Sequence, residues 1–141
     1  MRYLDTSILV AALTREPRTG DMQNWLGAQR ADSLCISDWV VTEFSAALSM
    51  KVRMEILTAR ERATVLGAFA ALREASLTTV PVSSMDYRMA AHFADGHASG
   101  LRAGDALHLA IAYNHGLELC SLDKTLVAAA EPLGVNAAAL L

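Results

Sequence analysis

Short apolar runs alternate along the chain with longer stretches in which apolar residues recur at helical spacing. The runs predict strands at residues 2–5, 34–37, 79–82, 118–122 and 135–137. The stretches between them predict helices at roughly 7–14, 20–30, 38–52, 58–75, 84–97, 104–115 and 124–131. Strands that alternate with helices are typical of βαβ units, in which helices cover both faces of a parallel sheet. We therefore expect an α/β fold, a three-layer α/β/α sandwich with a five-stranded, mainly parallel sheet.

Signals for helix ends support this division of the chain. Thr58 and Glu61 have the spacing of a capping box ahead of an apolar run. Asp105 and Asp123 stand at predicted helix starts, and Gly116 stands at a predicted helix end. No linker-like stretch or internal repeat separates these elements, so we expect a single domain over residues 1–141.

The composition is that of a folded protein rather than a disordered one, with 53% hydrophobic and 19% charged residues. No apolar run is long enough to predict a membrane span. Asp5 interrupts the apolar N-terminal run, which we interpret as a strand rather than a targeting segment. Cys35 and Cys120 lie in separate apolar runs, and buried free thiols of this kind are typical of a reducing cytoplasm.

Four acidic residues stand where apolar sequence would otherwise continue. Asp5 and Asp123 follow predicted strands, Asp105 starts a predicted helix, and Glu43 lies one turn into the helix after the second strand. Ligand sites in parallel sheets lie beyond the carboxyl ends of the strands, so these positions are well placed for chemistry. Each aspartate could instead cap a helix, and Glu43 could lie on an exposed polar stripe. If Glu43 is buried, an arginine or a metal ion must compensate its charge.

Taken together, the four acids could converge on one edge of the sheet. Carboxylates so close together need a counter-charge, and Mg²⁺ or Mn²⁺ suits oxygen ligands. Such a site can activate water for attack on a phosphodiester. Removing four acids from the formal net charge of −3 leaves +1, so the metal-loaded protein need not repel a polyanion.

Other phosphate chemistries fit the sequence less well. The chain has no GxxxxGK[ST] or GxGxxG phosphate loop and no nucleophile elbow. Ser7 stands where a haloacid-dehalogenase-type phosphatase would need a second Asp. His108 lies one helical turn after Asp105 and could touch the site, although packing is the more common role for such a histidine. Trp25 and Trp39 are interpreted as core or interface residues.

Four short strings carry a family resemblance. They are YLDTSILVAAL, CISDWVVTEFSAAL, LRAGDALHLAIA and LCSLDKTLVAAAEPLG, in this order and together spanning residues 3–134. The sequence resembles the PIN-domain ribonucleases and, within them, the VapC-type toxins of bacterial toxin–antitoxin pairs. The resemblance implies a PIN-like fold over the whole chain. Leu126 stands where many members have an aromatic residue after the last acid.

The resemblance also implies a site and a reaction. Asp5, Glu43 and Asp105 match the core metal-binding acids, and Asp123 matches the fourth, more variable one. Thr6 and Ser7 match the hydroxyl residues that orient the first acid or a bound water. The implied activity is Mg²⁺- or Mn²⁺-dependent endoribonuclease activity that leaves 3′-hydroxyl and 5′-phosphate ends. Two alternatives remain open: a nuclease of the same fold that acts on DNA, and a catalytically weak PIN-like RNA-binding module.

The implied partners are RNA, a cognate VapB-like antitoxin and a second copy of the chain in a cytoplasmic homodimer. The helical stretch from Trp39 to Leu57 offers more apolar positions than one narrow stripe needs, and surplus apolar surface often marks an interface. Alternatively, many of the extra apolar residues are alanines that line tightly packed helices. Single-stranded RNA targets are read by a few loop contacts, so the sequence does not indicate the RNA target. The candidates for phosphate contact are Arg15, Arg18, Arg102 and Lys124.

Overall fold

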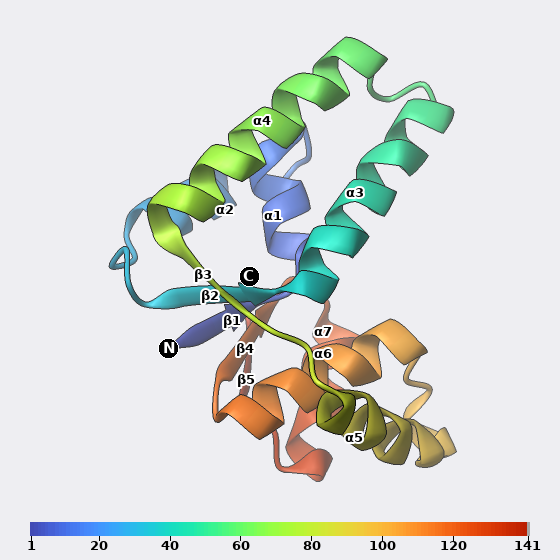
Figure 1. The fold of residues 1–141 in the computed structure, drawn as a ribbon. Helices are drawn as coiled ribbons and strands as arrows, with labels where there is room; N and C mark the ends of the chain where they lie inside the picture. Colours follow the sequence, from blue (N-terminus) through green and yellow to red (C-terminus); the bar gives the residue numbers. More distant parts are fainter. Residues whose placement is uncertain (141) are drawn as a thin grey trace.

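The computed structural model describes residues 1–140 (Figure 1). Its strands are β1 (Arg2–Leu4), β2 (Leu34–Ser37), β3 (Leu77–Val80), β4 (Glu118–Ser121) and β5 (Ala137–Ala139). Its α-helices are α1 (Thr6–Leu13), α2 (Thr19–Gly27), α3 (Asp38–Arg53), α4 (Ala59–Ser76), α5 (Ser84–Asp95), α6 (Ala103–His115) and α7 (Lys124–Ala130). Two short 3-10 helices, η1 (His97–Ser99) and η2 (Glu131–Leu133), follow α5 and α7.

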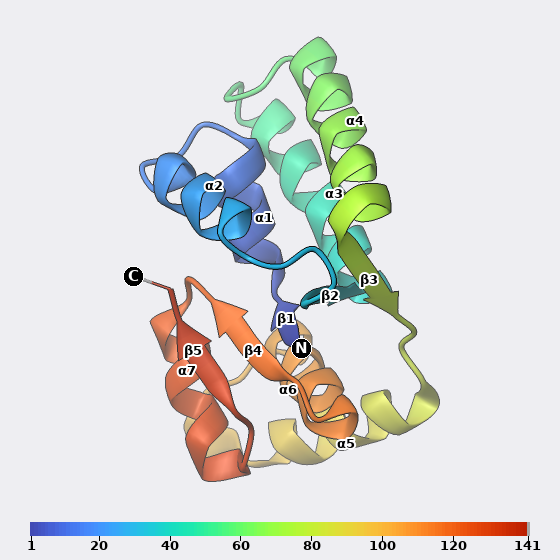
Figure 2. The same cartoon turned by 90° about the vertical axis from the view of Figure 1, so that its left-hand side faces the viewer.

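The five strands form one sheet in the order β3-β2-β1-β4-β5, and every neighbouring pair is parallel. Helices α1 to α4 lie on one side of the sheet and α5 to α7 on the other (Figures 1 and 2). The predicted three-layer α/β/α sandwich with a five-stranded sheet is therefore confirmed.

The strand order places a topological switch point at the centre of the sheet. From β1 the chain moves outward to β2 and β3, and it then returns to the other side of β1 to form β4 and β5. In open parallel sheets the crevice for a ligand opens at such a point, outside the carboxyl ends of the strands. Here that position lies between Leu4, the last residue of β1, and Ser121, the last residue of β4.

Side chains cap several helices at this carboxyl edge. Asp5 accepts a hydrogen bond from the Ser7 amide at the start of α1, and Asp123 accepts from the Thr125 and Leu126 amides at the start of α7. Both aspartates therefore cap helices, which was the alternative interpretation of these residues from the sequence. Asp105 differs, because Arg102 is the N-cap of α6 and Asp105 lies inside the first turn.

Two strands, β3 and β5, are each shifted by two residues from the sequence expectation, and β1 and β4 each end one residue earlier than expected. β3 begins at Leu77 rather than Thr79, because α4 runs to Ser76 and passes directly into the strand. β5 begins at Ala137 rather than Val135, because Val135 is buried and its amide bonds the Ala130 carbonyl as the chain leaves the helical region.

The core surrounds the sheet, and the α3–α4 hairpin extends beyond it (Figure 1). Phe69 is the buried residue of α4, and its ring packs at 4.2 Å from that of Phe44 on α3. Cys35 and Cys120 are buried free thiols, as predicted. Over residues 1–140 the structure contains no helix that is long and apolar enough to cross a membrane.

Candidate functional site

Asp5 is a buried carboxylate at the switch point, and both of its oxygens accept hydrogen bonds. Oδ1 accepts from the Ser7 hydroxyl at 2.5 Å and the Ser7 amide at 3.1 Å, and Oδ2 accepts from the Ser121 hydroxyl at 2.5 Å. Burial raises the pKa of Asp5, and the hydrogen bonds from Ser121 and Ser7 only partly oppose this shift. Ser7 therefore contacts the first acid, as the sequence led us to expect.

Ser121 joins the ends of β1 and β4. Its hydroxyl donates to Asp5 and accepts the Asp123 amide at 2.9 Å, so one side chain links two of the predicted site residues. The Ser7 hydroxyl similarly accepts the Leu122 amide at 3.0 Å. Ser121 was not among the candidate residues predicted from the sequence. Its signal was a hydroxyl at the last position of a buried apolar strand.

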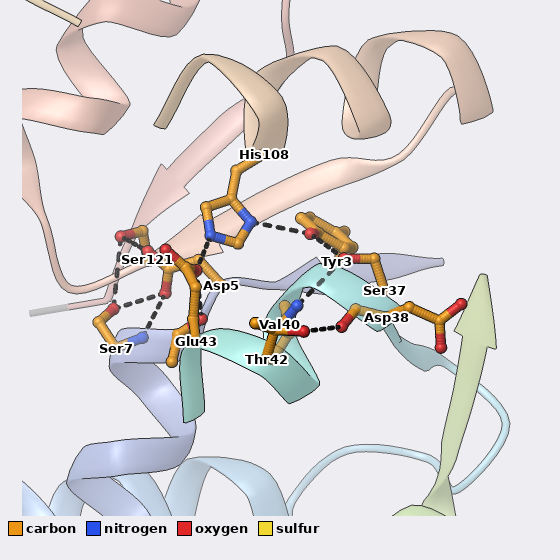
Figure 3. Close-up of polar contacts among 11 residues, drawn as sticks. Tyr3, Asp5, Ser7, Ser37, Asp38, Val40, Thr42, Glu43, His108 and Ser121 are labelled. Atoms are coloured by element: carbon orange, nitrogen blue, oxygen red, sulfur yellow. Dashed lines mark hydrogen bonds and ion pairs between the residues drawn. The ribbon is translucent and has the colours of Figure 1, made fainter. Parts of the chain in front are cut away.

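Glu43 reaches the same edge from α3, and its carboxylate is half-buried. Oε1 accepts a hydrogen bond from the Thr6 hydroxyl at 2.6 Å. It accepts a second from His108 Nε2 at 2.5 Å (Figure 3). Burial acts to raise the pKa of Glu43, but the hydrogen bond and charge of His108 and the bond from Thr6 outweigh it, so the pKa is lowered. His108 and Thr6 thus supply the compensation for which we expected an arginine or a metal ion.

These contacts change two expectations. The Thr6 hydroxyl binds Glu43 and not the first acid, because α1 and α3 lie side by side at the start of both helices. His108 touches the site, although we considered packing its more common role. The side chain is only 3% exposed, and its ring spans the space between Glu43 and Tyr3.

A second set of bonds continues from His108 into the core (Figure 3). The Tyr3 hydroxyl lies 2.8 Å from His108 Nδ1 and 2.8 Å from the Ser37 hydroxyl, which in turn caps α3. Burial raises the pKa of Tyr3, so the phenol keeps its proton. The first strand, the start of α3 and the first turns of α6 are thereby connected through polar groups.

Asp105 interacts electrostatically with the other acids. Burial and the negative charge of Asp123 raise its pKa, Glu43 adds to this shift, and the positive charges of His108 and Arg102 oppose it. Like charges that raise the pKa of a carboxyl group mark a place where negative charge is crowded.

Gly104 allows α6 to approach α3 closely. A Cβ atom at this position would lie 3.1 Å from Glu43 Oε2 and 3.3 Å from Trp39 Cζ2. Oε2 is the other carboxylate oxygen of Glu43, since Oε1 is the one that accepts the two hydrogen bonds. Trp39 is half-buried. The absence of a side chain at residue 104 therefore leaves room for Oε2.

The donor set suits a hard divalent cation in its chemistry, since it consists of carboxylate oxygens in a region of crowded negative charge. Within residues 1–140, however, no three His, Cys, Asp or Glu side chains are gathered closely enough to hold a metal ion. The metal-binding role of Asp5, Glu43, Asp105 and Asp123 stays a prediction.

Comparison with known proteins gives a consistent result for the fold. A family model described as PIN domain matches residues 2–132. No curated protein matches the chain. Among solved structures, FitAcB from Neisseria gonorrhoeae is similar with a TM-score of 0.74 at 17% identity, covering 97% of this chain and 96% of that chain. VapC20 from Mycobacterium tuberculosis, described as a sarcin-ricin loop cleaving toxin, has a TM-score of 0.72 at 18% identity, covering 92% of this chain and 95% of that one.

A third similar structure is VapBC2 from Rickettsia felis bound to a DNA fragment from its promoter. Its TM-score is 0.69 at 14% identity, and the alignment covers 99% of this chain and 98% of that chain. At these identities the structures establish likeness of fold, while the match to the family model rests on the sequence itself.

Proposed function

The chain belongs to the PIN-domain family, and from this premise we propose that it is a metal-dependent endoribonuclease that acts as the toxin of a toxin–antitoxin pair. The observation that carries the proposal is the position of its acids. Asp5 and Asp123 are both hydrogen-bonded to Ser121 at the switch point. Asp105 is close enough to Asp123 and Glu43 for their charges to raise its pKa.

In this proposal Asp5, Glu43, Asp105 and Asp123 hold Mg²⁺ or Mn²⁺. A divalent cation bound there would activate water and stabilise the charge that develops on a phosphodiester, giving 3′-hydroxyl and 5′-phosphate ends. Ser7 orients Asp5 and Thr6 orients Glu43 through the bonds described above. Arg102 and Lys124, each near one of the site aspartates in sequence, are candidates for contact with RNA phosphates.

The named activity of one similar structure supports the choice of RNA as substrate. VapC20 is described as a sarcin-ricin loop cleaving toxin, and another similar structure is described as a toxin–antitoxin complex from Klebsiella pneumoniae. Two alternatives are a nuclease of the same fold that acts on DNA and a catalytically weak RNA-binding module. The retention of all four acids favours an active enzyme over the binding module.

The test is cleavage of a structured RNA and of a DNA of the same sequence by purified protein. We expect Mg²⁺- or Mn²⁺-dependent cuts in the RNA alone, with 5′-phosphate ends, and loss of cleavage in EDTA. Sequencing of RNA ends after brief induction in cells identifies the target. Full cleavage by rigorously metal-free protein would contradict the mechanism, and cleavage of the DNA alone would support the second candidate.

We also propose a cognate VapB-like antitoxin and a homodimer as cytoplasmic partners. Exposed apolar side chains support a protein interface: Met85 and Tyr87 on α5 are 60% and 56% exposed. Trp39 and Tyr87 line a groove of about 310 Å³ between α5 and α6. Sedimentation at micromolar concentration, alone and with the product of an adjacent small gene, tests both partners. A monomer that does not bind this product would contradict them and leave the nuclease proposal standing.

A further inference from the structure

We propose that Tyr3 and His108 are positioning residues that hold Glu43 Oε1 and thereby present Glu43 Oε2 to a bound divalent cation. This inference rests on the proposed function, since it assigns the cation to the same site. It concerns two core side chains that do not themselves carry the negative charge of the site.

The two carboxylate oxygens of Glu43 have different contacts. Oε1 accepts hydrogen bonds from both Thr6 and His108, whereas no donor among residues 1–140 bonds Oε2, which lies beside Gly104, where an added Cβ would approach it to 3.1 Å. A carboxylate with one oxygen fixed by two donors has little freedom to rotate. Its other oxygen therefore keeps one direction, as a ligand for a cation requires.

His108 is hydrogen-bonded on both sides of its ring, to Glu43 and to Tyr3. A carboxylate only accepts, so His108 Nε2 must carry a proton to bind Glu43. On the other side of the ring, Nδ1 lies 2.8 Å from the Tyr3 hydroxyl, so the ring is held between Tyr3 and Glu43. The Ser37 hydroxyl is hydrogen-bonded to the Tyr3 hydroxyl and accepts a hydrogen bond from the Val40 amide, so each of these groups has a partner.

Tyr3 and His108 are both buried. Tyr3 is 0% exposed and His108 is 3% exposed, so neither side chain can contact RNA directly. Their effect on the reaction must pass through Glu43. Hydrogen-bonding partners of metal ligands typically change metal affinity or activity by about 10- to 100-fold when they are removed.

The test uses Mn²⁺ binding by calorimetry without RNA, together with kcat and RNA affinity. We expect His108→Leu to weaken Mn²⁺ binding by about 10- to 100-fold, and Tyr3→Phe, which keeps the aromatic ring, by about 10-fold. His108→Gln keeps an N–H donor that can reach Glu43, so it should recover much of the loss. RNA affinity measured without metal should not change, so the loss appears in kcat rather than in KM.

Two control variants separate positioning from general damage to the core. Thr14→Val removes a buried hydroxyl that bonds the Val10 carbonyl on α1, away from the site, and His92→Gln removes an exposed histidine. Both should bind Mn²⁺ like the wild type. Nitrogen NMR of ¹⁵N-labelled histidine gives a readout that does not depend on metal, and we expect His108 to carry a proton on Nε2.

The outcomes distinguish this inference from the proposed function. Wild-type protein that binds Mn²⁺ and cleaves RNA, with Tyr3→Phe and His108→Leu unchanged in both, would overturn the positioning role alone. A His108 ring without a proton on Nε2 would overturn it as well. Wild-type protein that neither binds Mn²⁺ nor cleaves RNA would overturn the proposed function together with this inference.

Discussion

Single residues at the site differ in how their charge is compensated. The Asp5 carboxylate accepts hydrogen bonds from hydroxyl and amide donors on both oxygens, yet burial still raises its pKa. Glu43 is stabilised as an anion by His108 and Thr6, and its pKa is lowered. Asp105 has a raised pKa because burial and nearby acids act together. Asp5 and Asp105 are therefore the two acids whose negative charge the surrounding groups do not fully compensate.

Asp105→Asn should abolish cleavage while leaving the metal-free protein folded and slightly more stable at neutral pH. The raised pKa means that the ionised Asp105 destabilises the folded state above its unfolded pKa, and asparagine removes this term. The gain should shrink as the pH falls through the raised pKa and vanish below about pH 4, where aspartate is neutral in both states. We expect activity to fall about 100-fold or more.

Melting curves of both proteins between pH 4 and pH 8, recorded in EDTA, measure this difference. Asp38→Asn is the matched control, since Asp38 is an exposed acid in the first turn of α3. It should give no gain in stability and keep activity. A constant difference between Asp105→Asn and wild type across the pH range would argue against charge repulsion at this residue.

Ser121→Ala should destabilise the fold, because it leaves a buried carboxylate oxygen of Asp5 and the Asp123 amide without their present partner. Loss of a hydrogen bond to a buried charged group costs about 1.5–3 kcal/mol. Urea unfolding of the metal-free protein measures the change. Ser84→Ala, at an exposed serine of α5, should stay within about 0.5 kcal/mol of wild type. Equal stability of the two variants would show that the Ser121 bonds add little.

For single residues, the positions of the acids could be predicted from the sequence, but the residues that form hydrogen bonds with them could not. Asp5 and Asp123 could be found because each follows an apolar run. The bonds of Ser121 to Asp5 and of His108 to Glu43 join residues 116 and 65 positions apart, and they depend on which strands and helices become neighbours. Local spacing carries no information on such neighbours.

At the level of elements, the close approach of α6 to α3 at Gly104 has a measurable consequence. Alanine normally favours a helix over glycine by about 1 kcal/mol, so a Gly→Ala change in an open helix should stabilise the protein. Gly67 in α4 has no neighbouring atom within 4 Å of an added Cβ, and Gly67→Ala should show this gain. Gly104→Ala should not, because its Cβ would press on Glu43 and Trp39.

We also expect Gly104→Ala to lower kcat by displacing Glu43 Oε2, while Gly67→Ala keeps full activity. Thermal melting and cleavage assays of the two variants side by side measure both effects. A Gly104→Ala protein that is more stable than wild type and fully active would mean that α3 and α6 can move apart without loss of stability or activity.

Helices were predicted well from sequence because their ends carry chemical signals. The Thr58–Glu61 capping box forms as expected at the start of α4. The end of α4 has no such signal, since Leu77 continues the apolar pattern and belongs equally well to a helix or a strand. Its assignment to β3 is decided by pairing with Leu34 on β2, a contact between distant parts of the chain.

At the level of the whole molecule, a formal net charge of −3 combines with a concentration of acids at one edge of the sheet. A ligand that binds only the folded state stabilises it, by about 2.7 kcal/mol at one hundred times its Kd. Mg²⁺ or Mn²⁺ should therefore raise the Tm of wild-type protein, and the rise should be lost in Asp105→Asn. Potassium chloride of equal ionic strength is the control, and an equal rise with potassium would indicate general screening instead.

The position of β1 in the middle of the sheet has a consequence for how the protein is made. Residues 2–4 leave the ribosome well before residues 118–121, which form their neighbour β4. At about 5–20 residues per second, several seconds or more separate the synthesis of β1 from that of β4, its second partner. Until then Asp5 lacks Ser121 and Asp105 lacks the nearby charge of Asp123. A nascent chain that has not yet reached β4 therefore cannot assemble the proposed nuclease site, which forms only after residues 118–123 have been made.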